Sequence, residues 1–432
     1  MQPEYTHQTF GQKETIRGYT GLDLRLFLDS MTFHALAQIR HEAKLPNADD
    51  VLFKLQENFP GGLAQTQAAY TEQVASASTE LTDSLAKLPV VIERVDGVAV
   101  RQTTLNAADA AIKGLHLRLQ PLLLFFVDGA SLLDCTEPDW ILLLATRKDP
   151  QGFEQVVGFT TLATFYGHPH SQRIRVSQVL VLPPYQRQGI GQLLLQAAFK
   201  VADDSNAVEV AFEDPTDQLQ RLRQCVELKR ALALPWLVAL SSGAIASVAA
   251  QHSHTHSGTG TVNGHPANEN SNGHSNGCID AGSVEEAHVK MAAGIALSPE
   301  HVAKAQKELR MGPHQVRIAW EALLARQPGF ADGPGRAALQ ALVERRLRGR
   351  NASVEGKKIF DKGETGWVMC RIPKGLEIAA VNALDSSEAQ AQAQAHAIEE
   401  LATEEGEEGG AEDIEGQVKA RMEALYRRPG LA

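Results

Sequence analysis

Apolar runs that predict strands and helices are densest in the middle of the chain, over residues 89–235. Two apolar runs there, Trp140–Lys148 and Gln155–Phe165, flank the polar turn sequence Asp149-Pro150-Gln151-Gly152. Apolar runs on both sides of such a turn are typical of a β-hairpin. The pattern therefore predicts two paired strands in this region.

A third apolar run predicts a strand that is followed by a helix. The pattern predicts a strand over Arg173–Leu182, a helix over Ile190–Val201 and a further strand over Ala207–Phe212. Ahead of the hairpin, an apolar stretch at Ala107–Val127 is interrupted by Pro121, which cannot donate a backbone hydrogen bond. The middle region therefore combines strands with helices.

Weaker patterns flank this region. Residues 1–88 mix short apolar runs such as Leu22–Leu28 with polar turns, which indicates a small α+β domain. After residue 290, Ser298 followed by Pro299 marks a helix start, with serine as the N-cap. This helix, a second one from Pro313 to Arg326 and a third over Arg336–Arg348 predict a helical domain at residues 291–350.

Two segments lack the apolar residues that a core needs. Ser, Gly, Asn, Thr and His dominate from Ser241 to Glu285, so we expect a disordered insert over residues 236–290. Residues 351–432 are expected to be a mostly disordered tail, apart from a short helix near Val418–Arg427. Nine acidic residues and no basic one lie between Glu399 and Glu415, so this acidic run carries −9 of the formal net charge of −11.

Composition narrows the class of protein only slightly. The four cysteines lie far apart, without CxxC or paired histidine spacing, which argues against a zinc site and a disulfide framework and favours the cytosol or nucleus. The histidines of the insert could bind a metal, but a low-complexity linker explains them too, and we expect no metal. Ala231–Ala250 is twenty residues without a charge, yet it holds Pro235 and Gly243, so we expect a helix end and no membrane span.

Basic residues do not point clearly to a nucleic acid. Arg345, Arg346, Arg348 and Arg350 form a cluster that could touch nucleic acid or could be a solvated helix face. Outside the acidic run Glu399–Glu415 the chain is close to neutral, so net charge indicates little about its partners. We expect no direct nucleic-acid contact.

The turn after the third strand, Pro183–Gly189, carries more specific chemistry. It brings the open N–H groups of a helix N-terminus beside Gly189 and Gly191, where the missing Cβ atoms would let a phosphate approach. Arg187 adds a cation. No Lys-Ser/Thr pair follows and a third glycine is missing, so this is neither a P-loop nor a dinucleotide fingerprint. An ordinary strand–helix turn is the alternative.

The motifs around this turn resemble a known family. Gln186-Arg187-Gln188-Gly189-Ile190-Gly191 fits the Q/R-x-x-G-x-G/A pattern of the GCN5-related N-acetyltransferase (GNAT) superfamily, which cradles the pyrophosphate of acetyl-CoA. Arg175–Leu195, Phe212–Pro215 and the N-terminal Pro3–Gly11 and Gly18–Leu22 resemble one branch, the type B histone acetyltransferase catalytic subunits. The resemblance implies an α+β protein: a GNAT fold at residues 89–235, with a mixed central sheet flanked by helices, between an N-terminal α+β domain and a C-terminal helical domain.

The resemblance also implies roles for individual residues. Glu213 would be the general base with Asp214 beside it, although an acidic pair could also simply start the next helix. Backbone groups of Val179, Leu180 and Val181 would hold the pantetheine arm. The pyrophosphate would lie against Gln186, Arg187, Gln188, Gly189, Ile190, Gly191 and Gln192. The histone would lie against Gln12, Lys13, Glu14, Ala163, Thr164, Phe165 and Tyr166.

By the same resemblance, the expected reaction transfers acetyl from acetyl-CoA to lysines in the N-terminal tail of newly made histone H4, before chromatin assembly, in the nucleus and cytoplasm. A WD40 histone-chaperone subunit would be the partner. Relatives carry more acidic residues near Gln12 and Lys13, so the choice of lysine stays open. They also carry an additional N-terminal segment, so a truncated N-terminus is one hypothesis.

Two alternatives remain. The chain could be an acetyltransferase of the same fold that acts on another protein or a polyamine amine, or a non-catalytic histone-binding subunit. The complete glycine turn together with Glu213 favours an enzyme. The acidic tail could attract histones or merely keep the protein soluble.

Overall fold

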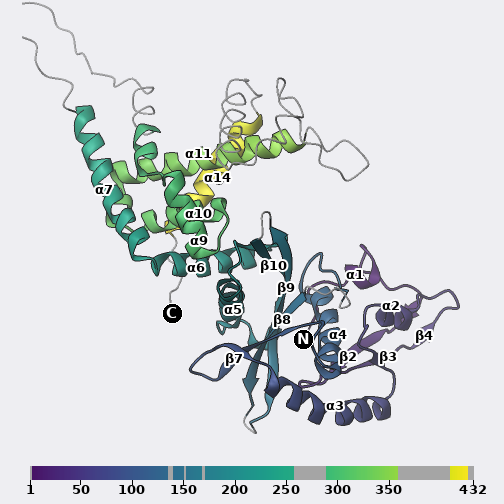
Figure 1. Cartoon of the computed structure of the whole chain (residues 1–432). Coiled ribbons are helices and arrows are strands. Elements are labelled where there is room, and N and C mark those ends of the chain that lie inside the picture. Colours follow the sequence, from purple (N-terminus) through teal and green to yellow (C-terminus); the bar gives the residue numbers. More distant parts are fainter. Residues whose placement is uncertain are drawn as a thin grey trace, which may run out of the picture. The chain divides into compact units, whose positions relative to one another are not determined.

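The chain forms two compact units in the computed structural model, which describes residues 2–134, 140–149, 152–167, 171–256, 289–358 and 409–426 (Figure 1). The sheet unit comprises Met1–Arg230 and Val302–Val316. The helical unit comprises Ala231–His301 and Arg317–Ala432. Each unit is described by itself.

The sheet unit is built around a mixed central sheet. Its six strands lie in the order β11-β10-β9-β8-β7-β6. Their bounds are β6 (Val90–Glu93), β7 (Val98–Thr104), β8 (Trp140–Lys148), β9 (Glu154–Gly167), β10 (Ser171–Val181) and β11 (Val210–Phe212). Neighbouring strands are antiparallel except β10 and β11, which are parallel. The predicted hairpin is confirmed as β8 and β9, paired from Trp140 opposite Ala163 to Lys148 opposite Glu154.

The remaining elements of the two units are helices, 3-10 turns and short strands. The principal helices are α1 (His7–Phe10), α2 (Val51–Glu57), α3 (Gln67–Lys87), α4 (Ala110–Phe126), α5 (Ile190–Asp204), α6 (Asp217–Leu232), α7 (Pro235–His256), α9 (Pro299–Leu309), α10 (Pro313–Ala325), α11 (Gly333–Lys358) and α14 (Gly409–Tyr426). Two 3-10 turns are η1 (Pro183–Tyr185) and η2 (Pro328–Phe330). The N-terminal strands are β1 (Tyr19–Thr20), β2 (Asp23–Leu28), β3 (Ala35–Arg40), β4 (Ala43–Lys44) and β5 (Leu63–Ala64).

Helices cover both faces of the central sheet because side chains of a strand alternate between its faces. Phe159 of β9 packs in the main core with Leu119 of α4. The neighbouring Gly158 lies on the other face, where an added Cβ would be 3.5 Å from Leu194 of α5. The sheet is therefore enclosed between α4 and α5 (Figure 1), and the mixed α+β fold expected from the sequence is confirmed.

The N-terminal residues share the main core with the central sheet. β2, β3 and β5 form their own three-stranded sheet, packed on a smaller cluster that includes Leu55 and Phe125 of α4. Phe33, Leu81 and Leu85, however, belong to the main core together with the residues of α4 and β8. The boundary predicted at residue 88 therefore separates the two sheets, but residues from both sides of it pack together in each core cluster.

Helix α4 continues through Pro121, where the apolar pattern is interrupted. A proline inside a helix costs about 3 kcal/mol, and burial of one large apolar side chain contributes about 1.5–3 kcal/mol. Leu119, Leu122 and Leu123 are all buried beside Pro121, so packing outweighs the missing hydrogen bond.

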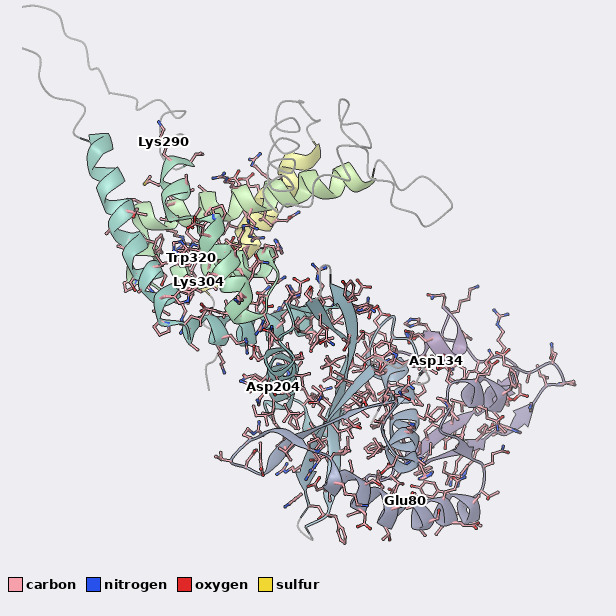
Figure 2. All side chains as sticks on the ribbon, viewed as in Figure 1. Glu80, Asp134, Asp204, Lys290, Lys304 and Trp320 are labelled. Atoms are coloured by element: carbon pink, nitrogen blue, oxygen red, sulfur yellow. The ribbon has the colours of Figure 1, made fainter. Side chains whose placement is uncertain are left out.

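The helical unit begins earlier than the sequence predicts. Residues 236–256, placed in the disordered insert, form α7, because the helix buries Leu237, Ala244 and Val248 against its neighbours. Residues 257–288 of the insert lie outside the described residues. Trp320 is buried in this unit, and its indole Nε1 donates to the carbonyl of Ile295 at 2.9 Å (Figure 2).

The C-terminal helices also differ from the predicted bounds. The third predicted helix, expected to end at Arg348, continues as α11 to Lys358. A helix lies in the tail as expected, and α14 is longer than predicted; residues 359–408 lie outside the described part. Within the basic cluster, Arg346 pairs with Glu321 and Arg348 pairs with Glu344.

No single helix in the described ranges has the length and apolar character of a membrane span. Asp217–Leu232 and Pro235–Val248 meet that test only as a pair, bent by 91°.

Candidate active site

Strands β10 and β11 diverge after a short parallel pairing. They pair over three residues, the last being Val176 opposite Phe212. The N–H of Glu213 then donates to the carbonyl of Val176 at 3.0 Å. β10 continues to Val181 with β9 on its other side, so one edge of its second half has no strand partner among the described residues.

A β-bulge at Ser177 decides which backbone groups face this open edge. The register of β10 against β9 shifts between Val176 and Gln178. Beyond the bulge, the N–H of Leu182 donates to β9, at the carbonyl of Val157 (3.0 Å). Because backbone groups alternate in direction along a strand, the N–H groups of Val179 and Val181 face the open edge.

The three residues predicted to hold the pantetheine therefore differ in position. Val179 and Val181 present backbone groups at the open edge, whereas the backbone of Leu180 faces β9. Its side chain is 4% exposed and lies in the main core. An extended ligand with amide groups could bind along this edge like an added strand.

The turn after β10 exposes the N-terminus of α5. Arg187 (φ 61°) and Gly189 (φ 78°) have left-handed backbone conformations. Gly189 is the N-cap, and no side chain caps the helix. The first N–H groups of α5 therefore have no side-chain partner, and the helix dipole makes this end attractive to an anion.

The structure shows why glycine is required at positions 189 and 191, which the sequence alone does not reveal. Gly189 needs its positive φ, and an added Cβ would meet Nη1 of Arg94 at 2.9 Å. At Gly191 an added Cβ would lie 3.0 Å from Cδ2 of Leu222 in α6 and 3.6 Å from Cγ2 of Val181. Gly191 thus lets α6 and β10 approach the start of α5.

Side chains of the turn mostly bind the turn itself. Nε2 of Gln186 donates to the carbonyl of Val181 at 3.1 Å, and Nε2 of Gln188 donates to the carbonyl of Pro184 at 3.2 Å. Ile190 is buried at 1% exposure. A ligand here would therefore contact mainly backbone N–H groups.

Two basic side chains that contact the segment Gln186–Gln192 were not identified from the sequence. Nη1 of Arg94, after β6, donates to the carbonyl of Gln188 at 2.8 Å, while Asp96 holds its Nε at 2.7 Å. Nζ of Lys229 on α6 donates to Oε1 of Gln192 at 3.1 Å. Neither has a local sequence signal, because each reaches the turn from a distant part of the chain.

Glu213 follows the last residue of β11 and pairs with an arginine. Its Oε2 lies 3.3 Å from Nε of Arg175 on β10. The guanidinium of Arg175 lies over the ring of Phe165 on β9, 4.5 Å from the ring centre. The side chain of Glu213 is 43% exposed, and Asp214 beside it has a positive φ of 31°. A partly exposed carboxylate therefore stands at the end of the diverging strands.

The other residues predicted near the histone on β9 differ in accessibility. Ala163 is buried in the main core and offers no side chain to a ligand. Thr164 is half-buried. Phe165 and Tyr166 are 42% and 72% exposed, so the structure leaves two aromatic side chains accessible at this end of β9.

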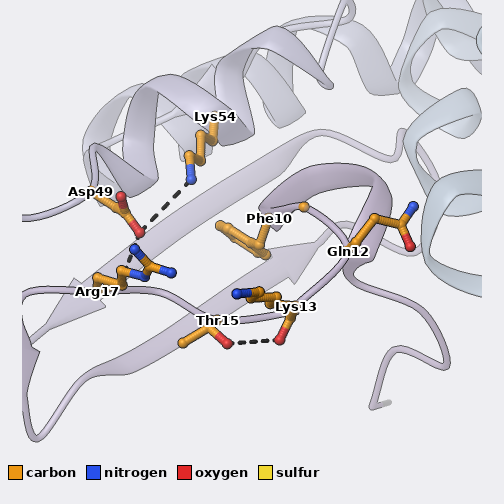
Figure 3. A pocket seen from close by; sticks show the side chains of 8 residues that line it. Phe10, Gln12, Lys13, Thr15, Arg17, Asp49 and Lys54 are labelled. Carbon is orange, nitrogen blue, oxygen red and sulfur yellow. Dashed lines mark hydrogen bonds and ion pairs between the residues drawn. The ribbon is translucent and has the colours of Figure 1, made fainter.

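The N-terminal residues Gln12, Lys13 and Glu14 separate into two environments. Gln12 and Lys13 line an open pocket of about 270 Å³ (Figure 3). Its charged lining residues are Lys13, Arg17, Lys54 and Asp49. With three cations and one anion, this pocket would repel a basic peptide.

Glu14 instead belongs to a small acidic cluster. Its Oε1 accepts the N–H of Thr6 at 2.9 Å, and this hydrogen bond lowers the pKa of the Glu14 carboxyl below its usual value. His7 lies between two carboxylates, with Nδ1 3.8 Å from Glu14 and Nε2 3.4 Å from Asp128. Asp128, in the loop after α4, was not identified in the sequence.

That loop is fixed to the bulge of β10 by Gln178, another residue missed in the sequence. Nε2 of Gln178 donates to the carbonyl of Ser131 at 2.8 Å, and its Oε1 accepts from the Thr161 hydroxyl at 3.2 Å. Gln8 donates to the carbonyl of Ala130 at 3.2 Å. The N-terminal segment, the loop and β10 are therefore connected.

Within the part of the chain that the structure describes, no group of three or more His, Cys, Asp and Glu side chains could hold a metal ion.

Comparison with known proteins gives two matched families. Residues 1–128 match the family described as "Histone acetyl transferase HAT1 N-terminus", and residues 126–223 match "Acetyltransferase (GNAT) family". The second match contains the diverging strands, the glycine turn and Glu213.

Curated relatives carry the name "Histone acetyltransferase type B catalytic subunit". That of Arabidopsis thaliana is 28% identical over 247 residues, 53% of this chain and 53% of the relative. That of Zea mays is 31% identical over 243 residues, 54% and 51%. The human protein is 30% identical over 251 residues, 54% and 59%. The matches thus span about half the length of these relatives.

Among solved structures, an aminoglycoside acetyltransferase from an uncultured soil metagenomic sample is 16% identical. It has a TM-score of 0.25 and covers 30% of this chain and 86% of that one, a similarity too low to support an inference.

Proposed function

We propose that this chain, which carries the N-terminal domain of the HAT1 histone acetyltransferases followed by a GNAT domain, is a histone lysine acetyltransferase. Its reaction would transfer acetyl from acetyl-CoA to lysines in the N-terminal tail of newly made histone H4. The observation that carries the proposal is the geometry of one edge: β10 and β11 diverge between an uncapped helix N-terminus and a partly exposed carboxylate.

Acetyl-CoA would bind along this edge. The N–H groups of Val179 and Val181 fit the amide groups of an extended pantetheine arm. The open N–H groups at the start of α5 fit the pyrophosphate, with Arg187 and Lys229 adding positive charge. An N–H group at this edge would also face the thioester oxygen, where negative charge develops during attack.

Glu213 is the proposed general base. At pH 7 only about one lysine side chain in 2,500 with a pKa of about 10.4 is in the neutral, nucleophilic form. Deprotonation of the lysine therefore costs roughly 4.6 kcal/mol. A carboxylate at the end of β11 can accept this proton from the lysine directly or through one water. Asp214 is adjacent, and its positive φ turns the chain away after Glu213.

The acceptor is proposed to be a basic histone tail. The relatives' names support a histone as substrate, and the accessible Phe165 and Tyr166 offer apolar contact to lysine side chains. Glu14 and Asp128 offer negative charge, whereas the pocket at Lys13 does not suit a basic peptide. We therefore propose that the tail follows the acidic cluster and not that pocket.

The cellular setting is proposed from the same family. H4 would be acetylated before chromatin assembly, in the nucleus and cytoplasm, with a WD40 histone-chaperone subunit as partner. Pull-down with purified chaperone, followed by cell fractionation, tests these two points separately from the chemistry.

Incubation with labelled acetyl-CoA and an equimolar mixture of free histones tests the activity. Mass spectrometry should find the label on H4 tail lysines. Glu213→Gln should bind acetyl-CoA with little change but lose turnover by about 10²–10⁴-fold near neutral pH. Glu72→Gln, an exposed carboxylate on α3, is the matched control.

Other outcomes separate the alternatives. Label on polyamines or other proteins but on no histone would favour another acceptor for the same fold. Failure to bind acetyl-CoA would favour a non-catalytic histone-binding subunit. Equal turnover in Glu213→Gln and wild type would remove the base assignment while leaving the rest of the proposal.

A further inference from the structure

We infer that Arg175 is a positioning residue for Glu213, and that Phe165 holds Arg175 in place. The inference rests on the proposed function, because it assigns Glu213 the role of base. It adds Arg175 to the site and gives a further role to Phe165, which the family resemblance places near the histone.

The three side chains come from three neighbouring strands and share one face of the sheet. Arg175 of β10 is opposite Ala163 of β9 and opposite Ala211 at β11. Glu213 lies two residues beyond Ala211, and Phe165 lies two residues beyond Ala163, opposite Arg173 of the antiparallel β10. Because side chains two residues apart share a face, all three project to the same side. The bulge at Ser177 comes two residues after Arg175, so the cluster lies where the open edge begins.

Glu213 needs an external constraint. It follows the last paired residue of β11, its side chain is 43% exposed, and the chain turns at Asp214 with a positive φ. A glutamate in such a place has several accessible rotamers. The contact with Nε of Arg175 at 3.3 Å selects the one that keeps the carboxylate beside Arg175, where β10 and β11 begin to diverge.

Arg175 is itself constrained. Its Nε is shielded from solvent and makes no hydrogen bond of normal geometry among the described residues, so the carboxylate of Glu213 is the anion that compensates it. The guanidinium plane lies 4.5 Å from the ring centre of Phe165, a cation–π contact. The aromatic ring therefore fixes the arginine, and the arginine fixes the base.

The pairing also affects the approach of the substrate. A lysine ammonium is repelled by a free guanidinium, and the repulsion is removed when Glu213 neutralises Arg175. Removal of either partner should therefore impair catalysis more than acetyl-CoA binding, because the cofactor edge at Val179 and Val181 is left unchanged.

The chain offers a matched control. Arg173 lies two residues earlier on the same face of β10 and makes a similar ion pair, with Nε 3.4 Å from Oε1 of Glu209. This pair precedes the diverging part of the strands. Arg173→Gln removes an equivalent charge and ion pair from the same strand without touching Glu213. Arg173 is opposite Phe165, so a crystal structure of this variant should also show the Phe165 ring unmoved beneath Arg175.

The experiment compares kcat with the acetyl-CoA Kd. Arg175→Gln should lower kcat by about 10- to 100-fold, the effect of misplacing a reacting group by about 1 Å, with a Kd within about twofold of wild type. Arg175→Lys should recover part of kcat, Phe165→Leu should lose part of it, and Arg173→Gln should match wild type.

A double variant tests whether Arg175 acts through Glu213. In the Glu213→Gln background, Arg175→Gln should cause no further loss, since residues that act as a unit are not additive. Additive losses, or wild-type kcat in Arg175→Gln, would overturn the inference.

A structural measurement, which does not depend on catalytic turnover, separates this inference from the proposed function. A crystal structure of Arg175→Gln should show the Glu213 carboxylate displaced, and an unmoved carboxylate would overturn the positioning role. Absence of acetyl transfer by the wild-type protein would instead overturn the proposed function.

Discussion

The backbone N–H of Val210 donates to the carbonyl of Arg310 at 2.8 Å. The outer edge of β11 is thereby closed by a segment from much later in the chain. In the Arg310 side chain, Nη1 donates to the carbonyl of Ala207 and Nη2 donates to Oδ1 of Asn206, both at 2.9 Å. Residues Val302–Val316 thus support the short strand that ends at Glu213.

Arg310→Ala should destabilise the sheet unit. The two hydrogen bonds to Ala207 and Asn206 are lost together with a longer one from Nε to Oδ1 of Asp203 at 3.4 Å. A hydrogen bond from a charged group contributes about 1.5–3 kcal/mol, so we expect the free energy of unfolding to decrease by at least about 3 kcal/mol. Urea denaturation measures it. Arg221→Ala, an exposed arginine on α6, is the control, and equal values for both variants would contradict the role of Arg310.

Gly189→Ala should weaken acetyl-CoA binding. A left-handed alanine costs about 1–2 kcal/mol, and its Cβ would displace Arg94, so Kd should rise about tenfold. Calorimetry measures it. Gly62→Ala has the same kind of backbone strain in open space and should leave Kd unchanged; a rise there too would mean that Gly189 acts only through general stability.

Gly191→Trp should abolish acetyl-CoA binding. The indole cannot fit between Leu222 and Val181, whose atoms already lie 3.0 and 3.6 Å from an added Cβ. It must therefore turn toward the open edge of β10 or separate α6 from α5. Gly191→Ala, which requires a shift of only a few tenths of an ångström, should retain binding, and tight binding by the tryptophan variant would show that the edge is not the cofactor site.

Asp96 should titrate unusually low. Hydrogen bonds from Arg94 lower the pKa of the Asp96 carboxyl from 3.8 to about 2. Since the pKa is depressed in the folded state, this stabilisation is complete above about pH 4 and is lost as pH falls through about 2. NMR titration of the carboxyl carbon measures the midpoint. A midpoint near 4 would mean that Arg94 is free to leave Gln188.

His116 should make stability depend on pH. It is fully buried, and burial lowers its pKa from 6.5 to about 4. The folded state therefore favours the neutral ring, and stability is lost as pH falls from about 6.5 toward 4, by up to about 3 kcal/mol. Urea denaturation across this range should show a smaller slope for His116→Gln, whereas the exposed His41→Gln should retain the wild-type slope.

The sequence predicts much of the local structure of the site but not its contacts. The β8–β9 hairpin, β10 and α5 follow from apolar runs and turn residues. The bulge at Ser177 has no such signal, because it arises from pairing with β9. The Arg175–Glu213 pair likewise depends on which strand lies beside β10, and that is decided by packing over the whole sheet.

The helix α7 shows a second limit of local pattern. Alanine and serine make up nine of its 22 residues and carry little periodic contrast, so the sequence favours a loop after Ser241. Burial of Ala244 and Val248 shows that small side chains form this helix where close packing is available. The nearby C-terminal helices were predicted because their apolar residues are larger and more regularly spaced.

The last described helix has a consequence for how the protein is made. Glu321 is 1% exposed and pairs with Arg346 and with Arg421 of α14, the latter at 3.4 Å. On the ribosome, Glu321 emerges before both of its cations, and Arg421 is added 100 residues after it. A premature stop in the acidic tail would leave that carboxylate undercompensated and the apolar sites of Val418 and Met422 open to chaperones and proteases. Such an allele would lower cellular abundance and leave the chemistry at Glu213 intact.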